Sequence, residues 1–235
     1  EDRIILSSFN NASIVLCRQS DETIAGGFLV EKYVDNAGVY ARTCDVQYYH
    51  PNLEYLKEER FSVQTDFCRQ LRKLTPIPLD IHLMISRPDT KLSCFAIQPG
   101  EYVSVHWEST PHIHRTIGAI AALGGKPMLA INPATPYDVI RYLLPDLAGV
   151  LVMTVDPGFA GQQLVPAMLQ KLRDLRAFLD ENGYPDLEIE VDGNVSFENA
   201  EKMRQAGATM FVGGSSSVFW KGASLSENIQ RMYAV

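Results

Sequence analysis

The sequence predicts an α/β fold of the (β/α)8 TIM barrel class. Short β-type runs alternate with segments of helical spacing over 235 residues, which is a normal length for one such barrel. Parallel strands joined by right-handed helical crossovers are the economical arrangement for that order, and eight units close into a barrel. An open doubly wound sheet is the alternative, but it needs a glycine-rich turn after an early strand, and "SSFNNASIVL" offers none. No linker or repeat divides the chain, so we expect one domain over residues 1–235.

The expected strands are short apolar runs bounded by turn residues. The expected helices have apolar residues three and four positions apart, and they cover 111–125, 135–146 and 166–183. The last of these ends at Gly183, a typical helix stop. Its apolar stripe consists of Leu169, Leu172, Leu175, Ala177 and Leu179. The eight expected strands cover residues 3–8, 38–44, 78–85, 101–107, 127–132, 148–155, 187–193 and 208–215.

Composition and charge argue against several classes of function. The net charge is −7 and no basic block is present, so the attraction that drives nucleic-acid binding has no source and we expect no nucleic acid. No apolar run reaches the ~18 residues of a membrane span, and the acidic start does not resemble a secretory signal. We therefore expect no membrane partner and a cytoplasmic location. The cysteines are widely and irregularly spaced, which indicates neither a zinc site nor a disulfide framework.

Barrel enzymes carry their catalytic groups at the carboxyl ends of the strands, and this rule selects several polar residues. His82 lies in the third predicted strand, where it is either a functional group or a hydrogen-bonded core histidine. Asp192 ends an apolar strand beside a glycine, which favours function over turn capping. The loops "DPGFAGQ", "DGN" and "GGSSS" follow the last three strands. Converging glycine amides form an anion site, so these loops predict phosphate binding.

Several motifs resemble the ribulose-phosphate 3-epimerase family. They are "LDIHLMI", "VSVHWE", "AINPATP", "VMTVDPGFAGQQLVPAMLQKLRDLR" and "IEVDGNVSFENAEKMRQAGATMFVGGSSSVF", and they extend from about Pro76 to Phe219. The phrase "VMTVDPGFAGQ" is particularly similar to the allulose-6-phosphate 3-epimerase branch. The resemblance implies an isomerase that inverts carbon 3 of a ketose phosphate through an enediolate, that uses a divalent metal (zinc, manganese or iron), and that forms homo-oligomers.

The resemblance also implies roles for individual residues. His82 and Asp192 match metal ligands, and Asp192 matches an acid/base group as well. His106 and Glu108 match positions on the fourth strand, where they either form a supporting hydrogen-bond network or act directly in catalysis. The remaining matches are Ser8, Met84 and Met153 in substrate binding, with His82 counted there too, and Gly158, Gly161, Gly193, Gly214 and Ser215 in phosphate binding.

The second predicted strand departs from the family pattern. If Asp45 in "YARTCDVQYYHPN" matches the family's second aspartate, Tyr40 stands in place of the metal histidine and Arg42 in place of the metal aspartate. Arginine donates hydrogen bonds only, so Arg42 cannot bind a metal. A shorter register makes Asp45 itself the metal and base aspartate, with Thr43 in place of the histidine. His50 is a further candidate ligand.

Three interpretations follow from this departure. In the first, the protein is an epimerase that uses Asp192, with or without Asp45, and its metal is displaced or missing. In the second, it is a catalytically impaired barrel that binds a sugar phosphate as a regulatory or partner subunit. In the third, the Arg42 guanidinium stabilises an anionic intermediate. Arg42 in a structural ion pair with Asp192 or Asp45 is the simpler alternative to that role.

Overall fold

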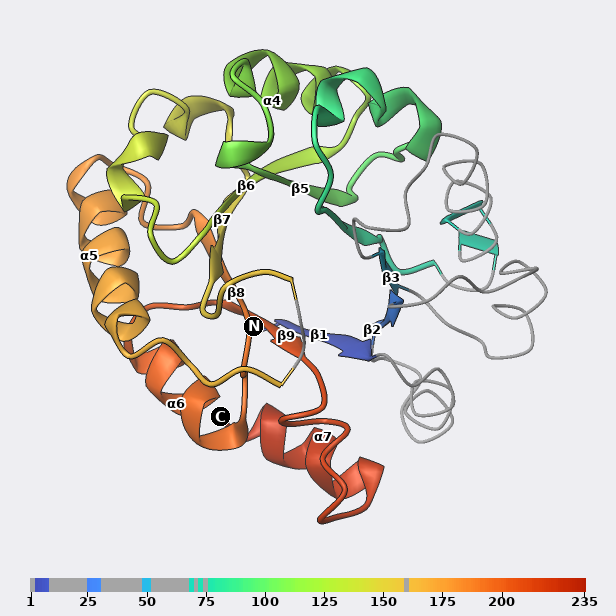
Figure 1. Cartoon of the computed structure of the whole chain (residues 1–235), viewed down its shortest axis with the longest axis vertical. Helices are drawn as coiled ribbons and strands as arrows, with labels where there is room; N and C mark the ends of the chain where they lie inside the picture. Colours follow the sequence, from blue (N-terminus) through green and yellow to red (C-terminus); the bar gives the residue numbers. More distant parts are fainter. Residues whose placement is uncertain are drawn as a thin grey trace.

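Parallel strands form the centre of the fold, and helices lie along their outer side (Figure 1). A computed structural model describes residues 3–8, 25–30, 48–51, 68–69, 72–73, 76–158 and 161–235. The strands are β1 (Arg3–Ser8), β2 (Ala25–Val30), β3 (Tyr48–Pro51), β4 (Asp80–Leu83), β5 (Tyr102–His106), β6 (Lys126–Ile131), β7 (Gly149–Met153), β8 (Glu188–Asp192) and β9 (Met210–Gly213). The helices are α4 (Ile113–Ala122), α5 (Ala167–Glu181), α6 (Phe197–Gln205) and α7 (Leu225–Tyr233).

All of these strands belong to one parallel sheet with the order β3-β2-β1-β9-β8-β7-β6-β5-β4. The sheet curls, so that its two edge strands β3 and β4 come within 8 Å of each other between Cα atoms. Chains with this curled arrangement of parallel strands and outer helices are TIM barrels, and the predicted fold class is confirmed. Each predicted strand from residue 78 onward overlaps one observed strand.

The amino-terminal strands differ from the expectation. The structure describes β2 and β3 in segments to which the sequence analysis assigned no strand, whereas the predicted strand 38–44 lies outside the described residues. The described part of the sheet therefore has nine strands where the sequence predicted eight for the whole barrel. The sequence "AGGFLV" of β2 has two adjacent glycines, which are typical of turns and weaken any strand prediction.

The strands from β4 to β7 are buried on both faces, as parallel strands covered by helices are. One face packs against the helices to form the main core, for example through Val150 and Val152 of β7. The alternate residues of the same strand, Leu151 and Met153, form a separate small cluster with Ala130. Since successive side chains of a strand point to opposite faces, this second cluster lies inside the barrel.

Helix α5 confirms the predicted helix, although its buried stripe is displaced. Leu172, Leu175 and Leu179 are buried as predicted. Leu169 is only half-buried and Ala177 is exposed, because the face toward the sheet runs instead through Met168 and Phe178. This face repeats at three and four residues, and position 177 breaks that repeat because it lies only two residues from both Leu175 and Leu179. The predicted stop at Gly183 lies two residues beyond the last helical residue.

The predicted helix over 135–146 is wrong. The structure has two short 3₁₀ turns there, Tyr137–Ile140 and Leu144–Asp146. Pro145 has no backbone N–H to donate and disfavours helical geometry at Leu144, so the apolar spacing does not extend into an α-helix. Among the helices in the described ranges, none is long and apolar enough to cross a membrane.

We predict opposite effects for one substitution at two glycines. A Cβ on Gly149 in β7 would lie 2.9 Å from both the Glu188 carbonyl oxygen and Cε of Met128, whereas a Cβ on Gly118 in α4 would meet nothing within 4 Å. Gly149→Ala should lower the free energy of unfolding by about 2 kcal/mol through overpacking. Gly118→Ala should raise it by up to about 1 kcal/mol, since alanine favours helix. Urea unfolding of both variants tests this, and equal effects would contradict it.

Candidate active site

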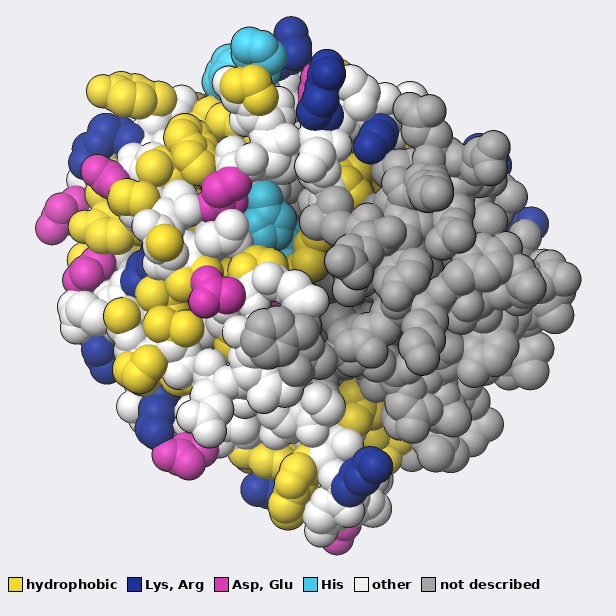
Figure 2. Space-filling model, viewed as in Figure 1, with side chains coloured by type: hydrophobic (Ala, Val, Ile, Leu, Met, Phe, Trp, Pro, Cys, Tyr) yellow, Lys and Arg dark blue, Asp and Glu magenta, His cyan; other side chains and the backbone are white. Residues whose placement is uncertain are grey.

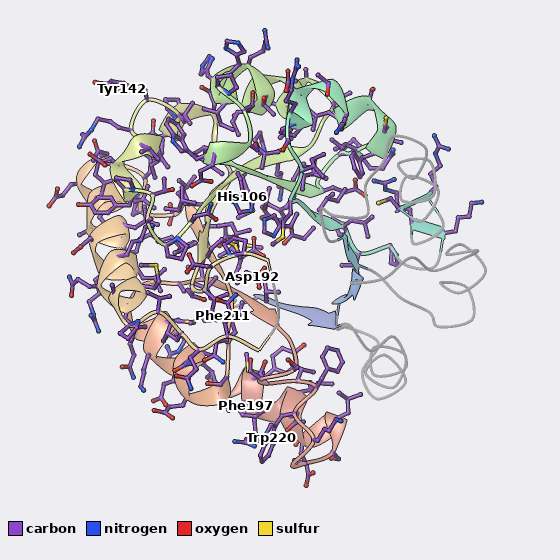
Figure 3. The ribbon with its side chains drawn as sticks, in the orientation of Figure 1. His106, Tyr142, Asp192, Phe197, Phe211 and Trp220 are labelled. Carbon is purple, nitrogen blue, oxygen red and sulfur yellow. The ribbon has the colours of Figure 1, made fainter. Side chains whose placement is uncertain are left out.

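The carboxyl ends of β4, β5 and β8 bring two histidines and one carboxylate together. The rings of His82 in β4 and His106 in β5 meet with their Nε2 atoms 2.8 Å apart. The Nδ1 atom of His82 lies 3.7 Å from Oδ2 of Asp192 in β8. Figure 3 places His106 and Asp192 near the centre of the barrel. In the same view, Figure 2 shows a histidine at the surface close to acidic side chains. The side chain of His82 is 3% exposed and that of Asp192 is 22% exposed, so the carboxylate is accessible to a ligand.

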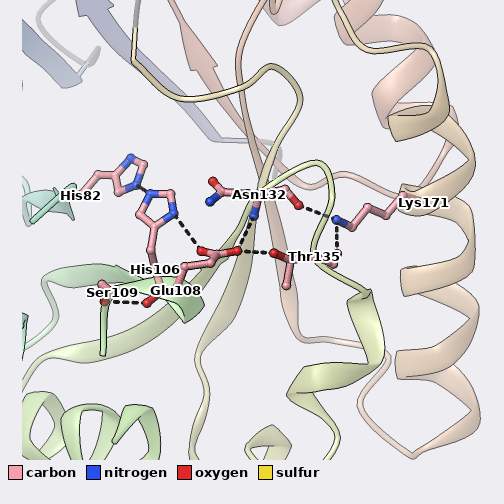
Figure 4. A network of polar contacts seen from close by, with 7 residues as sticks. All are labelled: His82, His106, Glu108, Ser109, Asn132, Thr135 and Lys171. Atoms are coloured by element: carbon pink, nitrogen blue, oxygen red, sulfur yellow. Dashed lines mark hydrogen bonds and ion pairs between the residues drawn. The ribbon is translucent and has the colours of Figure 1, made fainter. Parts of the chain in front are cut away.

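Glu108 extends this group toward the loop after β6 (Figure 4). Its Oε2 atom lies 3.6 Å from Nδ1 of His106. Its Oε1 atom accepts hydrogen bonds from the hydroxyl of Thr135 and, at 3.4 Å, from the backbone N–H of Asn132. Burial raises the pKa of Glu108, but the neighbouring His106 and Thr135 side chains outweigh it and hold the pKa at about 2. Glu108 is therefore a carboxylate at neutral pH.

Lys171 of α5 holds the same loop from the outer side of the barrel. Its ammonium group donates hydrogen bonds to the backbone carbonyl oxygens of Asn132 at 2.8 Å, of Pro133 at 3.3 Å and of Thr135. Three acceptors match the three N–H donors of an ammonium group. The side chain is buried, which lowers the pKa of Lys171 to about 8 against the opposing effect of the Glu108 charge. The sequence analysis missed this residue because it lies on the buried stripe of an ordinary helix.

A second pair of carboxyl groups lies deeper in the barrel, on β4 and β8. The sequence analysis missed this pair as well. Asp80 precedes His82 by two residues and Glu190 precedes Asp192 by two, so each faces the same side of the sheet as its neighbour. Both are buried. Burial raises the pKa of Asp80 to about 6, with a hydrogen bond from Glu190 opposing the rise, and burial together with the Asp80 charge raises the pKa of Glu190 well above its usual range. A two-residue step back from each predicted ligand would have found both groups.

The predicted methionines line the interior beside this group. Met153 packs with Ala130 and Leu151, and Met84 packs against the same cluster. The structure thus brings Met84 and Met153 together on one apolar surface. Their contact with substrate stays a prediction.

The backbone after Asp192 is fixed by a close approach at Gly193. Its φ is +120°, and a Cβ there would lie 2.6 Å from Cγ2 of Val155. Only glycine fits this position without displacement. The hydroxyl of Thr154 donates hydrogen bonds to the carbonyl oxygens of Asp192, at 3.0 Å, and of Gly193. The first turn after β8 is therefore held against the end of β7.

The remaining predicted phosphate residues follow β7 and β9. Gly158 and Gly161 lie in an exposed part of the loop after β7. The Gly214 N–H donates to the Ser217 hydroxyl at 3.3 Å and the Ser217 N–H donates to the Gly214 carbonyl at 3.1 Å, so the chain turns tightly after β9, with Ser215 exposed in this turn. Because β7, β8 and β9 are neighbours in a parallel sheet, their three loops share one edge. Phosphate binding by these loops stays a prediction.

Five residues of the predicted site cannot be placed. Tyr40, Arg42 and Asp45 lie outside the described residues, and of Ser8 and His50 only the strand backbone is described. The predicted departure from the family's metal motif and the predicted role of Asp45 therefore remain predictions.

Two of the predicted metal ligands lie close together. His82 and Asp192 face each other at 3.7 Å, a separation that suits two ligands lying about 2.1 Å from one divalent ion. Within the described ranges, no group of three or more histidine, cysteine, aspartate or glutamate side chains is arranged to hold a metal. The pair thus fits a metal but cannot complete its coordination without further ligands.

The chain is similar in sequence to known proteins. Residues 41–219 match the Ribulose-phosphate 3 epimerase family. The chain is 44% identical over 146 residues to a ribulose-phosphate 3-epimerase of Bacillus subtilis, an alignment that covers 62% of this chain and 67% of the relative. It is 36% identical over 190 residues to a ribulose-phosphate 3-epimerase of Serratia marcescens, covering 77% of this chain and 86% of the relative.

The fold is also found among solved structures. A mutant tryptophan synthase α-subunit from the hyperthermophile Pyrococcus furiosus superposes with a TM-score of 0.60 and covers 100% of this chain and 98% of its own. The two sequences are 13% identical, so this likeness supports the barrel fold alone.

We predict that Asp80 makes stability depend on pH. Because its pKa rises from 3.8 to about 6 on folding, the folded state binds more protons between these values, and the stability of the protein falls as the pH rises through that window. Asp80→Asn cannot ionise, so relative to wild type it should gain roughly 3 kcal/mol between pH 4 and pH 7. Chemical unfolding over this range measures the difference. Asp138→Asn, an exposed position, is the control, and a constant difference for Asp80→Asn would contradict the prediction.

Proposed function

Because this chain belongs to the ribulose-phosphate 3-epimerase family, we propose that it is an isomerase that inverts carbon 3 of a ketose phosphate. The pairing of His82 with Asp192 at the mouth of the barrel is the observation that carries the proposal. The alternative, a catalytically impaired barrel that binds a sugar phosphate as a regulatory or partner subunit, is favoured by none of the comparisons. The substrate is either ribulose 5-phosphate or allulose 6-phosphate.

Inversion at carbon 3 requires one group to remove a proton and another to return a proton on the opposite face. Asp192 suits one of these roles because its carboxylate is partly exposed. The hydrogen bond from the Thr154 hydroxyl to the Asp192 carbonyl oxygen holds the backbone that carries this side chain. We assign the opposite role to Asp45. The methionine surface of Met84 and Met153 keeps water from the intermediate, which protects the enediolate from side reactions.

The acidity of carbon 3 is low, so the negative charge of the enediolate needs stabilisation. His82 and Asp192 would hold a divalent metal, which would supply this stabilisation when bound. Zinc, manganese and iron are the candidates. The pKa values of the two carboxyl groups below, Asp80 and Glu190, are both raised by burial, that of Asp80 to about 6.

The substrate's phosphate group would bind at the edge formed by the loops after β7, β8 and β9. Gly158, Gly161, Gly193 and Gly214 have no side chain to obstruct an anion that approaches the backbone there, and Ser215 adds a hydroxyl. This edge adjoins Asp192, which ends β8, so one sugar phosphate can reach both. Homo-oligomer formation also stays a prediction.

We predict that Asp192→Asn abolishes proton exchange at carbon 3. An amide cannot accept the proton, so the rate of deuterium incorporation from D₂O into ribulose 5-phosphate or allulose 6-phosphate should fall at least about 100-fold. The exchange is followed by mass spectrometry with zinc, manganese or iron added. Asp186→Asn is the matched control, because this exposed aspartate lies just before the opposite end of β8.

Elemental analysis of the same samples completes the test. One divalent ion per wild-type chain together with exchange supports the epimerase. Binding of either sugar phosphate without exchange under any metal condition would overturn the proposal in favour of the binding protein.

A further inference from the structure

We propose that Asn194 is a positioning residue that joins the loops after β7 and β8 into one frame for the substrate's phosphate group. Asn194 follows Gly193 in the loop after β8, and its side chain contacts both the loop after β7 and the first turn of α6. The inference rests on the proposed function for phosphate as the ligand. The hydrogen bonds that carry it belong to the protein alone.

The backbone of Asn194 requires a residue that tolerates a positive φ. Its φ is +48°, in the left-handed region that glycine adopts freely and asparagine more readily than most residues. Glycine would satisfy the backbone but has no side chain to accept a hydrogen bond. Aspartate would supply an acceptor but would place a second negative charge two residues from Asp192, at the edge proposed to bind an anion. Asparagine therefore meets both requirements without that charge.

The side-chain oxygen of Asn194 accepts hydrogen bonds from two donors. The backbone N–H of Leu164, at the end of the loop after β7, donates to Oδ1 at 3.2 Å. The side-chain amide of Asn199 in α6 donates to the same oxygen at 2.7 Å and to the Asn194 backbone carbonyl at 3.0 Å. A backbone N–H can only donate, so the atom that faces Leu164 is the oxygen and not the amide nitrogen. The two donors use both lone pairs of that oxygen.

Asn199 is itself held by the start of α6. The Ser196 hydroxyl accepts a hydrogen bond from the Asn199 backbone N–H at 3.2 Å and caps the helix. The Ser196 backbone N–H donates to the Asn194 carbonyl at 2.8 Å. All three residues are half-buried, which strengthens these bonds relative to an exposed site. The first turn of α6 thus fixes the direction in which the Asn194 side-chain oxygen points.

These contacts close a ring around the base of the loop after β7. The Thr154 hydroxyl, where that loop begins, donates to the Gly193 carbonyl. Leu164, near the end of the loop, donates to Asn194. The Val165 N–H donates to the Thr154 carbonyl at 3.0 Å, which joins the two ends of the loop to each other. The loop after β7 is therefore fixed at both ends to the loop after β8.

The Asn194 side chain supplies one of these two connections between the loops. Without it, the end of the loop after β7 would be tied to Thr154 but no longer to the loop after β8. Groups that must become ordered when a ligand binds reduce its affinity, whereas groups held in place beforehand do not. We therefore expect the Asn194 side chain to increase the affinity for phosphate without contacting the phosphate itself.

Asn194→Gly tests this role because it removes the side chain and keeps a residue that accepts a positive φ. It should raise the dissociation constant of inorganic phosphate about 10-fold, measured by phosphorus-31 NMR titration, since two hydrogen bonds are lost. In the exchange assay it should raise KM for the sugar phosphate by a similar factor and leave kcat within about twofold, the pattern of lost uniform binding. Asn182→Gly, at an exposed position just after α5, is the matched control.

Asn199→Ala provides a second variant that leaves the positive φ untouched. It removes the donor that orients Asn194, so it should weaken phosphate binding in the same direction, by about 3-fold. The double variant should bind phosphate within about twofold of Asn194→Gly alone, because Asn199 acts through the Asn194 side chain. Asn199→Ala decides the question where Asn194→Gly does not fold.

Urea unfolding of the same variants identifies a purely structural role. Variants that lose stability but bind inorganic phosphate as the wild type does would overturn the positioning role, and so would a wild-type protein that binds no inorganic phosphate. Weaker phosphate binding by the variants of a protein that shows no exchange at carbon 3 would instead overturn the proposed function and leave the positioning role intact.

Discussion

The two-residue alternation along β4 and β8 determines the chemistry of the barrel interior. In β4 it places Asp80 and His82 on one face, and in β8 it places Glu190 and Asp192 on one face. These strands therefore carry two layers of ionisable groups inside an apolar barrel. Such groups are costly to bury unless they are paired, so each layer must satisfy its own members.

The layers solve this problem in different ways. In the lower layer, Asp80 and Glu190 share a hydrogen bond and keep protons at pH values where exposed carboxyl groups are ionised. In the upper layer, the ring of His82 contacts His106 through Nε2 and Asp192 through Nδ1, so it has a polar partner on two sides. The lower layer therefore becomes charged only at a higher pH than a pair of exposed carboxyl groups would.

Several predicted site residues that stand near the ends of strands lie together in the structure. His82, Met84, Met153 and Asp192 could be found because a polar or distinctive side chain near the end of an apolar strand, in family motifs, points to one edge. Lys171 could not be found from the sequence, because its partners are backbone carbonyl groups in another segment and no residue pattern indicates them. The prediction of a helix over 135–146 was wrong because it used apolar spacing alone and did not take account of the missing N–H of Pro145.

Lys171 also connects the outer helices of the barrel to a loop at the mouth of the barrel. Its carbon chain belongs to the packing of α5 against the sheet, while its ammonium group belongs to the loop after β6. A chimeric barrel that exchanged α5 for the helix of another protein would keep every strand and every residue that stands at a strand end. It would lose the hydrogen bonds from Lys171 to the loop whose Asn132 and Thr135 bind Glu108.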